Sequence, residues 1–165
     1  KIYKFQDDIP IDALKELEKH SSLAIDTEGS GLQIPHRDKL SLVQFSTGNN
    51  DAYIIQPNRK NYKAPNIVKI LENSKITKIG HYLRYDISGL EYFLKCDVQN
   101  IFDTKIASKL CRTYSQNHGL KDLVQEFCNK KLDKREYKWA FVGTPHKSSR
   151  HDLIFQFSKT YWILN

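Results

Sequence analysis

Two carboxylates follow a short apolar run near the start of the chain. Leu23, Ala24 and Ile25 are typical of a strand buried on both faces, and Asp26 and Glu28 come directly after them. Residues two apart on a strand point to the same face, so we expect these carboxylates to converge. Converging carboxylates repel each other, and Mg²⁺ and Mn²⁺ prefer such oxygen ligands. The segment suggests a metal site, although it also fits a strand that runs into a polar turn.

Two further acidic residues follow later strands. Asp86 falls in the first turns of an expected helix, and its neighbours at helical spacing are apolar, which allows it to face back toward the sheet. A negative charge near a helix N-terminus is also favourable in its own right. Asp103 immediately precedes another expected helix, and we interpret it as the N-cap of that helix.

The elements that must position these residues alternate between strands and helices. Strands are expected at 22–28, 40–46, 51–56, 76–80 and 101–102, and helices at 11–20, 65–73, 83–94, 104–111 and 120–128. The turn at 47–50 should join its two neighbouring strands as a hairpin. A hairpin followed by alternating strands and helices predicts an α/β domain with a mixed sheet flanked by helices. Ligand sites in such sheets lie beyond the strand ends, where Asp26 and Glu28 fall.

The composition limits the class of protein. A chain of 165 residues with 39% hydrophobic and 27% charged residues fits one globular domain. A net charge of +7 favours a polyanionic partner such as nucleic acid, and no apolar run approaches the ~20 residues of a membrane span. The three cysteines show no CxxC spacing, which favours a reducing compartment, so we expect a cytoplasmic protein.

Several short blocks recur in an order and spacing typical of one enzyme family. They are residues 24–28, 42–45, His81 with Tyr85 and Asp86, residues 102–107, 118–123 and 131–134, and Trp139. Together they resemble the 3′–5′ exonuclease domain of the ribonuclease D type, a branch of the DEDD exonucleases with a ribonuclease H-like fold. The resemblance implies an exonuclease domain over residues 1–139, followed by a divergent segment of the same domain over 140–165.

The resemblance also implies a mechanism. Asp26, Glu28 and Asp86 would hold two divalent ions, Mg²⁺ or Mn²⁺, about 4 Å apart. One ion would activate a water for attack on the terminal phosphodiester, and the other would stabilise the leaving 3′ oxygen. The implied substrate is the single-stranded 3′ end of an RNA, from which nucleoside monophosphates are released.

The remaining site residues implied by the resemblance bind the substrate rather than the metal. Thr27 and the backbone around Gly29 would lie near the terminal nucleotide. His81 stands at the family's histidine position, followed by Tyr82 in place of the usual asparagine. A structural or substrate-side role is expected for it.

The family's fourth carboxylate is not recognisable. It usually lies on a late helix, four residues after a tyrosine, and the best placement here puts Phe155 and Lys159 at those two positions. The one carboxylate after Glu136 is Asp152, which has Ser148 four residues earlier. A lysine at the fourth position would place a positive charge where a metal should bind.

Two explanations for this departure remain open. The protein is either a degenerate exonuclease that keeps nucleic-acid binding without cleavage, or its segment after about residue 140 arises from a frameshift. A Tyr-x-x-x-Asp motif in another reading frame of the gene would favour the frameshift. The leading hypothesis is a metal-dependent exoribonuclease, intact or impaired. The alternatives are a catalytically inactive nucleic-acid-binding remnant and a scaffold with no nucleic-acid role.

Overall fold

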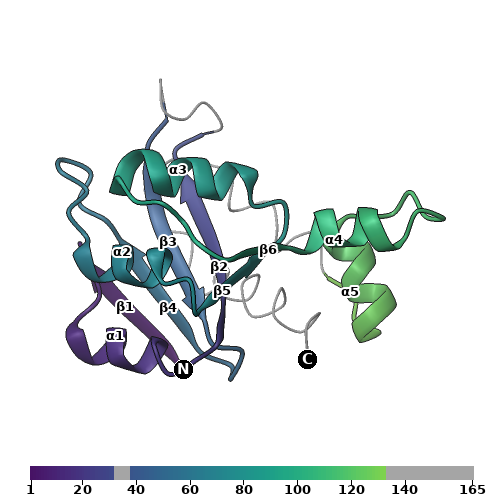
Figure 1. Cartoon of the computed structure of the whole chain (residues 1–165), viewed down its shortest axis with the longest axis horizontal. Coiled ribbons are helices and arrows are strands. Elements are labelled where there is room, and N and C mark those ends of the chain that lie inside the picture. The colour runs from purple at the N-terminus through teal and green to yellow at the C-terminus, as the bar shows by residue number, and fades with distance from the viewer. Residues whose placement is uncertain (32–37, 133–165) are drawn as a thin grey trace.

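One mixed sheet forms the centre of the molecule in the computed structural model, which describes residues 1–31 and 38–132 (Figure 1). The strands lie in the order β1-β4-β3-β2-β5-β6. Their bounds are β1 Ile2–Gln6, β2 Ser22–Gly29, β3 Leu40–Ser46, β4 Ala52–Gln56, β5 Thr77–Gly80 and β6 Ile101–Asp103. The helices are α1 Ile11–Leu17, α2 Pro65–Glu72, α3 Arg84–Leu94, α4 Thr104–Cys111 and α5 Leu120–Cys128.

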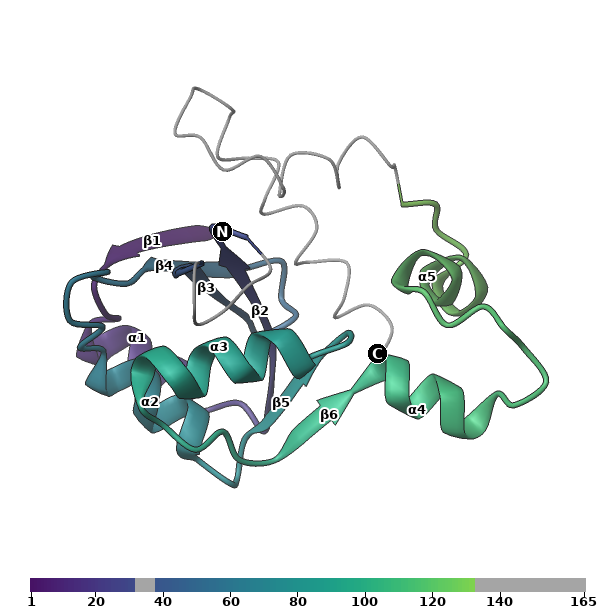
Figure 2. The same cartoon turned by 90° about the horizontal axis from the view of Figure 1, so that it is seen from above.

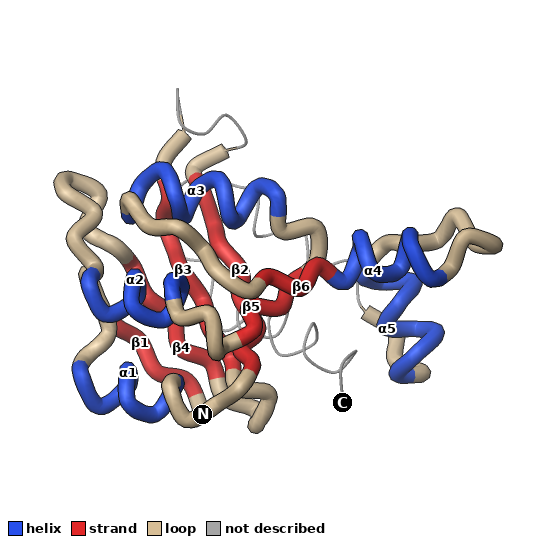
Figure 3. The backbone as a smooth tube through the Cα atoms, viewed as in Figure 1, coloured by secondary structure: helices blue, strands red, loops and turns tan. Residues whose placement is uncertain are grey.

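Strand β2 lies inside the sheet and carries the first carboxylates. It pairs antiparallel with β3 and parallel with β5, and β5 pairs parallel with β6. The carboxyl ends of β2, β5 and β6 therefore meet at one edge of the sheet. Figure 3 shows these three strands in red as neighbours in the sheet. This arrangement brings the segments after these three strands into the same neighbourhood.

Helices α1, α2 and α3 cover one face of the sheet (Figure 2). Leu23 and Ile25 belong to the apolar core that these helices help to form, together with Leu14, Ile67 and Leu90. Because side chains alternate along a strand, Asp26 and Glu28 point to the opposite face of β2, whereas Thr27 points toward the helices. The strand thus presents its carboxylates away from the main core.

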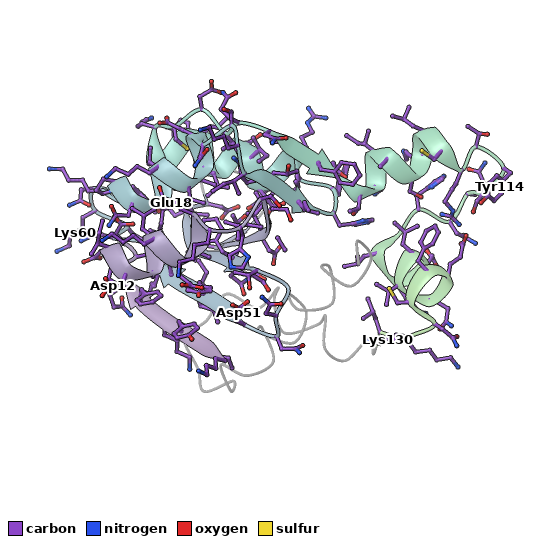
Figure 4. All side chains as sticks on the ribbon, turned by 60° about the horizontal axis from the view of Figure 1, so that its bottom comes forward. Asp12, Glu18, Asp51, Lys60, Tyr114 and Lys130 are labelled. Carbon is purple, nitrogen blue, oxygen red and sulfur yellow. The ribbon has the colours of Figure 1, made fainter. Side chains whose placement is uncertain are left out.

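Helices α4 and α5 form a hairpin that extends from the end of β6, beyond the edge of the sheet (Figure 1). Tyr114, in the connection between the two helices, lies at the outer end of this hairpin (Figure 4). Several of its apolar side chains are exposed, among them Ile106, Leu110 and Phe127.

The predicted α/β fold with a mixed sheet is confirmed, including the hairpin of β3 and β4. Strand β1 was not predicted, although Ile2, Tyr3 and Phe5 are good strand formers. It lies at the edge of the sheet with mostly exposed side chains, so it lacks the buried alternation that marks a strand in sequence. Among the described residues, no helix is long and apolar enough to cross a membrane.

Candidate active site

Asp26 and Glu28 lie half-buried on the same face of β2, as their spacing predicted. Asp26 is paired with Gln44 on β3, and the Gln44 side-chain amide donates to its Oδ2 atom at 3.4 Å. The pairing of β2 with β3 becomes irregular between Glu28 and Gly29. Gly29 follows Glu28 directly in the chain and is the last residue of β2.

Asp86 reaches β2 from the first turn of α3. It is buried, and its Oδ1 atom accepts hydrogen bonds from the Thr27 backbone N–H at 2.9 Å and from the Thr27 hydroxyl at 2.7 Å. Thr27 is buried as well, and its hydroxyl is occupied by the hydrogen bond that it donates to Asp86. The orientation of Asp86 toward the sheet, which the apolar neighbours in α3 allowed, is therefore present.

The three carboxylates influence one another electrostatically. Burial, then Asp86 and Glu28, raises the pKa of Asp26 well above its usual range. Burial and the charge of Asp86 raise the pKa of Glu28 to about 7. Burial raises the pKa of Asp86 to about 6, against the hydrogen bonds from Thr27, which lower it. Burial and mutual repulsion disfavour the ionised form of these three carboxylates. A cation bound beside them would relieve that repulsion.

The donor chemistry of this set fits a hard divalent cation, because all its donors are carboxylate oxygens. The described side chains do not form a complete coordination site. No group of three or more His, Cys, Asp or Glu side chains within residues 1–31 and 38–132 is arranged to hold a metal ion. Asp26 and Glu28 lie on one face of β2, and Asp86 approaches from the other, helix-covered face.

His81 follows β5 at the same edge of the sheet. Its Nδ1 atom lies 2.9 Å from the Thr104 hydroxyl, and that hydroxyl donates to the Gly80 carbonyl at 3.0 Å. Because the single hydroxyl proton of Thr104 is used on Gly80, Nδ1 of His81 must be the donor, which leaves Nε2 as an acceptor. Burial lowers the pKa of His81, which favours the neutral imidazole. These contacts give His81 a structural anchor on α4.

Asp103 is the N-cap of α4, as predicted, and it does more than cap the helix. It accepts from the backbone N–H groups of Lys105 and Ile106 and also from those of Tyr82 and Leu83. These four donors overcome the effect of burial and lower the pKa of Asp103. One carboxylate thus fixes the turn after β5 against the start of α4.

The sequence analysis named Tyr82 but gave it no role at the site. The turn holds it at a φ of 64°, and the residue is 56% exposed. The Lys105 ammonium lies 4.0 Å from the centre of this ring. An exposed aromatic ring beside a cation is the kind of surface that can stack with a nucleobase. Its signal in the sequence was an aromatic residue two positions after a strand, at the edge where sites occur.

The tail residues discussed for the fourth carboxylate position, Asp152, Phe155 and Lys159, lie outside the described residues. Their assignment stays a prediction, as does the division of the chain near residue 140.

A family model described as a 3′–5′ exonuclease matches residues 4–141 of this chain. No match was found among the curated proteins. Among solved structures, the chain is similar to Brucella melitensis NrnC bound to pGG, with 37% identity over 99% of this chain and 76% of that chain and a TM-score of 0.81. The same protein with bound Mg²⁺ shows 36% identity over 99% and 76%, with a TM-score of 0.80.

A more distant structure shares the fold. Escherichia coli RNase D, described as an exoribonuclease involved in structured RNA processing, is 21% identical over 98% of this chain and 42% of that chain, with a TM-score of 0.73. These matches confirm the resemblance inferred from the motifs. Since the family model spans most of the sequence and NrnC is 37% identical over nearly all of it, this chain belongs to the 3′–5′ exonuclease family.

Proposed function

We propose that this domain is a metal-dependent 3′–5′ exoribonuclease that releases nucleoside monophosphates from RNA. The observation that carries the proposal is the position of Asp26, Glu28 and Asp86 around the end of β2, where burial raises the pKa of each and the three carboxylates influence one another. Membership of the exonuclease family and the Mg²⁺ bound to NrnC support it. Two ions, Mg²⁺ or Mn²⁺, complete the proposal.

Each carboxylate has a defined part in this mechanism. Asp26 and Glu28 would supply oxygen ligands from β2, and Asp86 would supply the carboxylate oxygen that Thr27 does not hold. When bound, the ions supply an activated water and stabilise the departing 3′ oxygen. Neutral His81, anchored through Nδ1 on Thr104, presents Nε2 as an acceptor for a substrate hydroxyl. The backbone at Gly29 lies beside the carboxylates for contact with the terminal nucleotide.

The proposed partner is the single-stranded 3′ end of an RNA. The net charge of +7 favours a polyanion, and the NrnC relative was solved with pGG. The exposed Tyr82 ring, with Lys105 beside it, offers a stacking surface and a phosphate contact at the edge of the site. A cytoplasmic location is part of the proposal, and the three cysteines, which show no CxxC spacing, support it.

Digestion of a 5′-labelled single-stranded RNA with Mg²⁺ or Mn²⁺ tests the proposal. A ladder that shortens from the 3′ end is expected, and Asp26→Asn should abolish it. Asp12→Asn is the matched control, because Asp12 is an exposed carboxylate on α1 (Figure 4). The same substrate as DNA, digested in parallel, measures the preference for RNA.

The unrecognised fourth carboxylate favours a second candidate, an inactive nucleic-acid-binding module. Salt-sensitive RNA binding without a ladder in either metal would support this second function and contradict the first. Equal ladders from the wild type and Asp26→Asn would indicate a contaminating nuclease and would remove the support for the enzyme.

A further inference from the structure

Gln44 is a buried amide beside the carboxylates to which the mechanism above assigns no part. Its side chain is 1% exposed on β3, between the apolar residues Val43 and Phe45. It lies directly opposite Asp26 in the antiparallel pair, so both side chains share one face of the sheet. Its Nε2 atom donates to Asp26 Oδ2 at 3.4 Å.

The other half of the same amide has no partner. Oε1 of Gln44 is buried without a hydrogen bond among the described residues. An unpaired buried acceptor lowers the stability of a fold, and an apolar side chain of similar shape would avoid that loss. Leu42 and Ser46 share the face of Gln44 on β3, and neither forms a hydrogen bond with its Oε1 atom, so burial in the sheet alone gives no reason for an amide here.

The contact with Asp26 supplies a reason. We propose that Gln44 is a positioning residue of the carboxylate site, which holds Asp26 through Oδ2 and leaves Oδ1 directed to a divalent cation. A neutral N–H donor orients the carboxylate without neutralising it, whereas a lysine or arginine would compete with the cation. Thr27 does the same for Asp86, whose Oδ1 atom is held by two neutral donors.

This inference rests on the proposed metal-dependent function. It adds that Gln44, which is not one of the carboxylates, raises the affinity of the site for a cation. Its unpaired oxygen lowers the stability of the metal-free protein. Gln44→Leu separates the two effects, because it removes both the contact with Asp26 and the unpaired oxygen.

The experiment measures Mn²⁺ binding by isothermal titration calorimetry and thermal unfolding in metal-free buffer, without RNA. We expect Gln44→Leu to bind Mn²⁺ about 10–100-fold more weakly than the wild type, the range for loss of a partner of a metal ligand. Its melting temperature without metal should equal or exceed that of the wild type. Gln56→Leu, at an exposed position on β4, should change neither quantity.

The outcomes are distinct. Wild-type affinity in a folded Gln44→Leu protein overturns this inference and leaves the proposed function intact. No Mn²⁺ binding by the wild type overturns both. Weaker binding with a lowered melting temperature indicates structural damage and counts against positioning. If Gln44→Leu does not fold, Gln44→Met, with a flexible side chain of similar length, must show the weaker binding for the inference to stand.

Discussion

A single oxygen of Asp86 accepts both hydrogen bonds that Thr27 donates, from the backbone N–H at 2.9 Å and from the hydroxyl at 2.7 Å. This contact joins the first turn of α3 to the central strand β2. Asp26 and Glu28, the neighbours of Thr27, point to the other face of the same strand. Thr27 therefore links the two sides from which the carboxylates approach.

Thr27→Val should weaken this link with little change in shape. It removes the hydroxyl donor and keeps the backbone donor to Asp86. Because a hydrogen bond to a charged group contributes about 1.5–3 kcal/mol, we expect the free energy of unfolding to fall by about that amount at pH 8. The pKa of Asp86 should rise further, since the lost hydrogen bond lowers it. Urea denaturation and NMR titration of the carboxylate measure the two effects.

Thr27→Ser is the matched control, because it keeps the hydroxyl. It should retain the wild-type pKa of Asp86. At pH 5, where more of Asp86 is protonated, the loss of stability in Thr27→Val should be smaller. An equal loss at both pH values would contradict the role assigned to the contact.

The metal-free protein should lose stability as the pH rises through 7. In the folded state the pKa of Glu28 is about 7, raised from 4.5, and that of Asp86 is about 6, raised from 3.8. Between about pH 4 and pH 7 the folded state therefore binds more protons than the unfolded chain, and its stability falls with increasing pH. The loss due to Glu28 is on the order of 2–3 kcal/mol. Chemical denaturation in the presence of a chelator, from pH 5 to pH 8, measures it.

Mg²⁺ and a glutamine substitution provide the controls for this pH profile. Glu28→Gln cannot ionise, so its profile should be flatter and its metal-free stability at pH 8 should be higher. Added Mg²⁺ should stabilise the wild type more at pH 8 than at pH 5, since it favours the ionised carboxylates. A wild-type protein that is most stable at pH 8 without metal would contradict the raised pKa values.

The sequence predicted the parts of this site that depend on regular spacing. Asp26 and Glu28 share a face because strands alternate, and Asp103 caps α4 because it precedes a helix. The apolar spacing in α3 also allowed the orientation of Asp86 toward the sheet. Each of these inferences uses contacts within one element or between its immediate neighbours.

Long-range contacts could not be predicted in the same way. The exposure of Tyr82 depends on Asp103, which lies 21 residues later and fixes the turn through backbone N–H groups. The contact of Gln44 with Asp26 depends on the register of β2 with β3, and the contact of Thr27 with Asp86 spans 59 residues. Strand β1 pairs with β4, which lies far along the chain because Ile2 is opposite Ala52, and the exposed side chains of β1 give no periodic signal.

Lys78 should make the protein more stable as the pH rises above 8. Its side chain is fully buried in β5, and Nζ donates to the carbonyls of Asn73 at 2.8 Å and Ile76 at 2.7 Å. Burial lowers its pKa from 10.5 to about 8. Between these values the unfolded chain binds more protons, so the free energy of unfolding should rise with pH, by at most on the order of 3 kcal/mol.

Lys78→Met isolates this contribution, because methionine keeps the length of the side chain without the charge. The difference between wild type and variant in unfolding free energy should change between pH 7.5 and pH 9.5, in favour of the wild type at the higher pH. A difference that does not change with pH would mean that Lys78 keeps its ordinary pKa when buried.

Tyr82→Ala should weaken RNA binding without slowing the chemical step. Tyr82 is exposed beside Lys105 and contacts none of the three carboxylates through a hydrogen bond in the described residues. Base stacking on an aromatic ring contributes about 1–3 kcal/mol, so we expect KM to rise by roughly 5- to 100-fold with kcat nearly constant. Steady-state kinetics on short RNAs measure both constants.

Tyr92→Ala is the matched control for Tyr82. Tyr92 is also exposed and also has a lysine, Lys95, 4.4 Å from its ring centre, but it lies at the far end of α3 from Asp86. Its substitution should leave KM unchanged. If both variants raise KM equally, the effect comes from surface aromatic residues in general and not from a place at the site.

Arg112→Leu should loosen the α4–α5 hairpin and leave the sheet folded. Arg112 is 6% exposed, donates to the Ser108 hydroxyl at 3.0 Å and to the Asn117 carbonyl at 2.9 Å, and pairs with Glu126 of α5. These contacts join the two helices, which extend beyond the sheet edge (Figure 1). Hydrogen exchange should therefore speed up in α4 and α5 and stay slow in β2 and β3. Glu126→Gln keeps the hydrogen-bond acceptor and removes the charge. It should have a smaller effect, because the Glu126 side chain is 44% exposed and solvent screens its ion pair. Faster exchange throughout the sheet in Arg112→Leu would show that the hairpin and the sheet unfold as one unit.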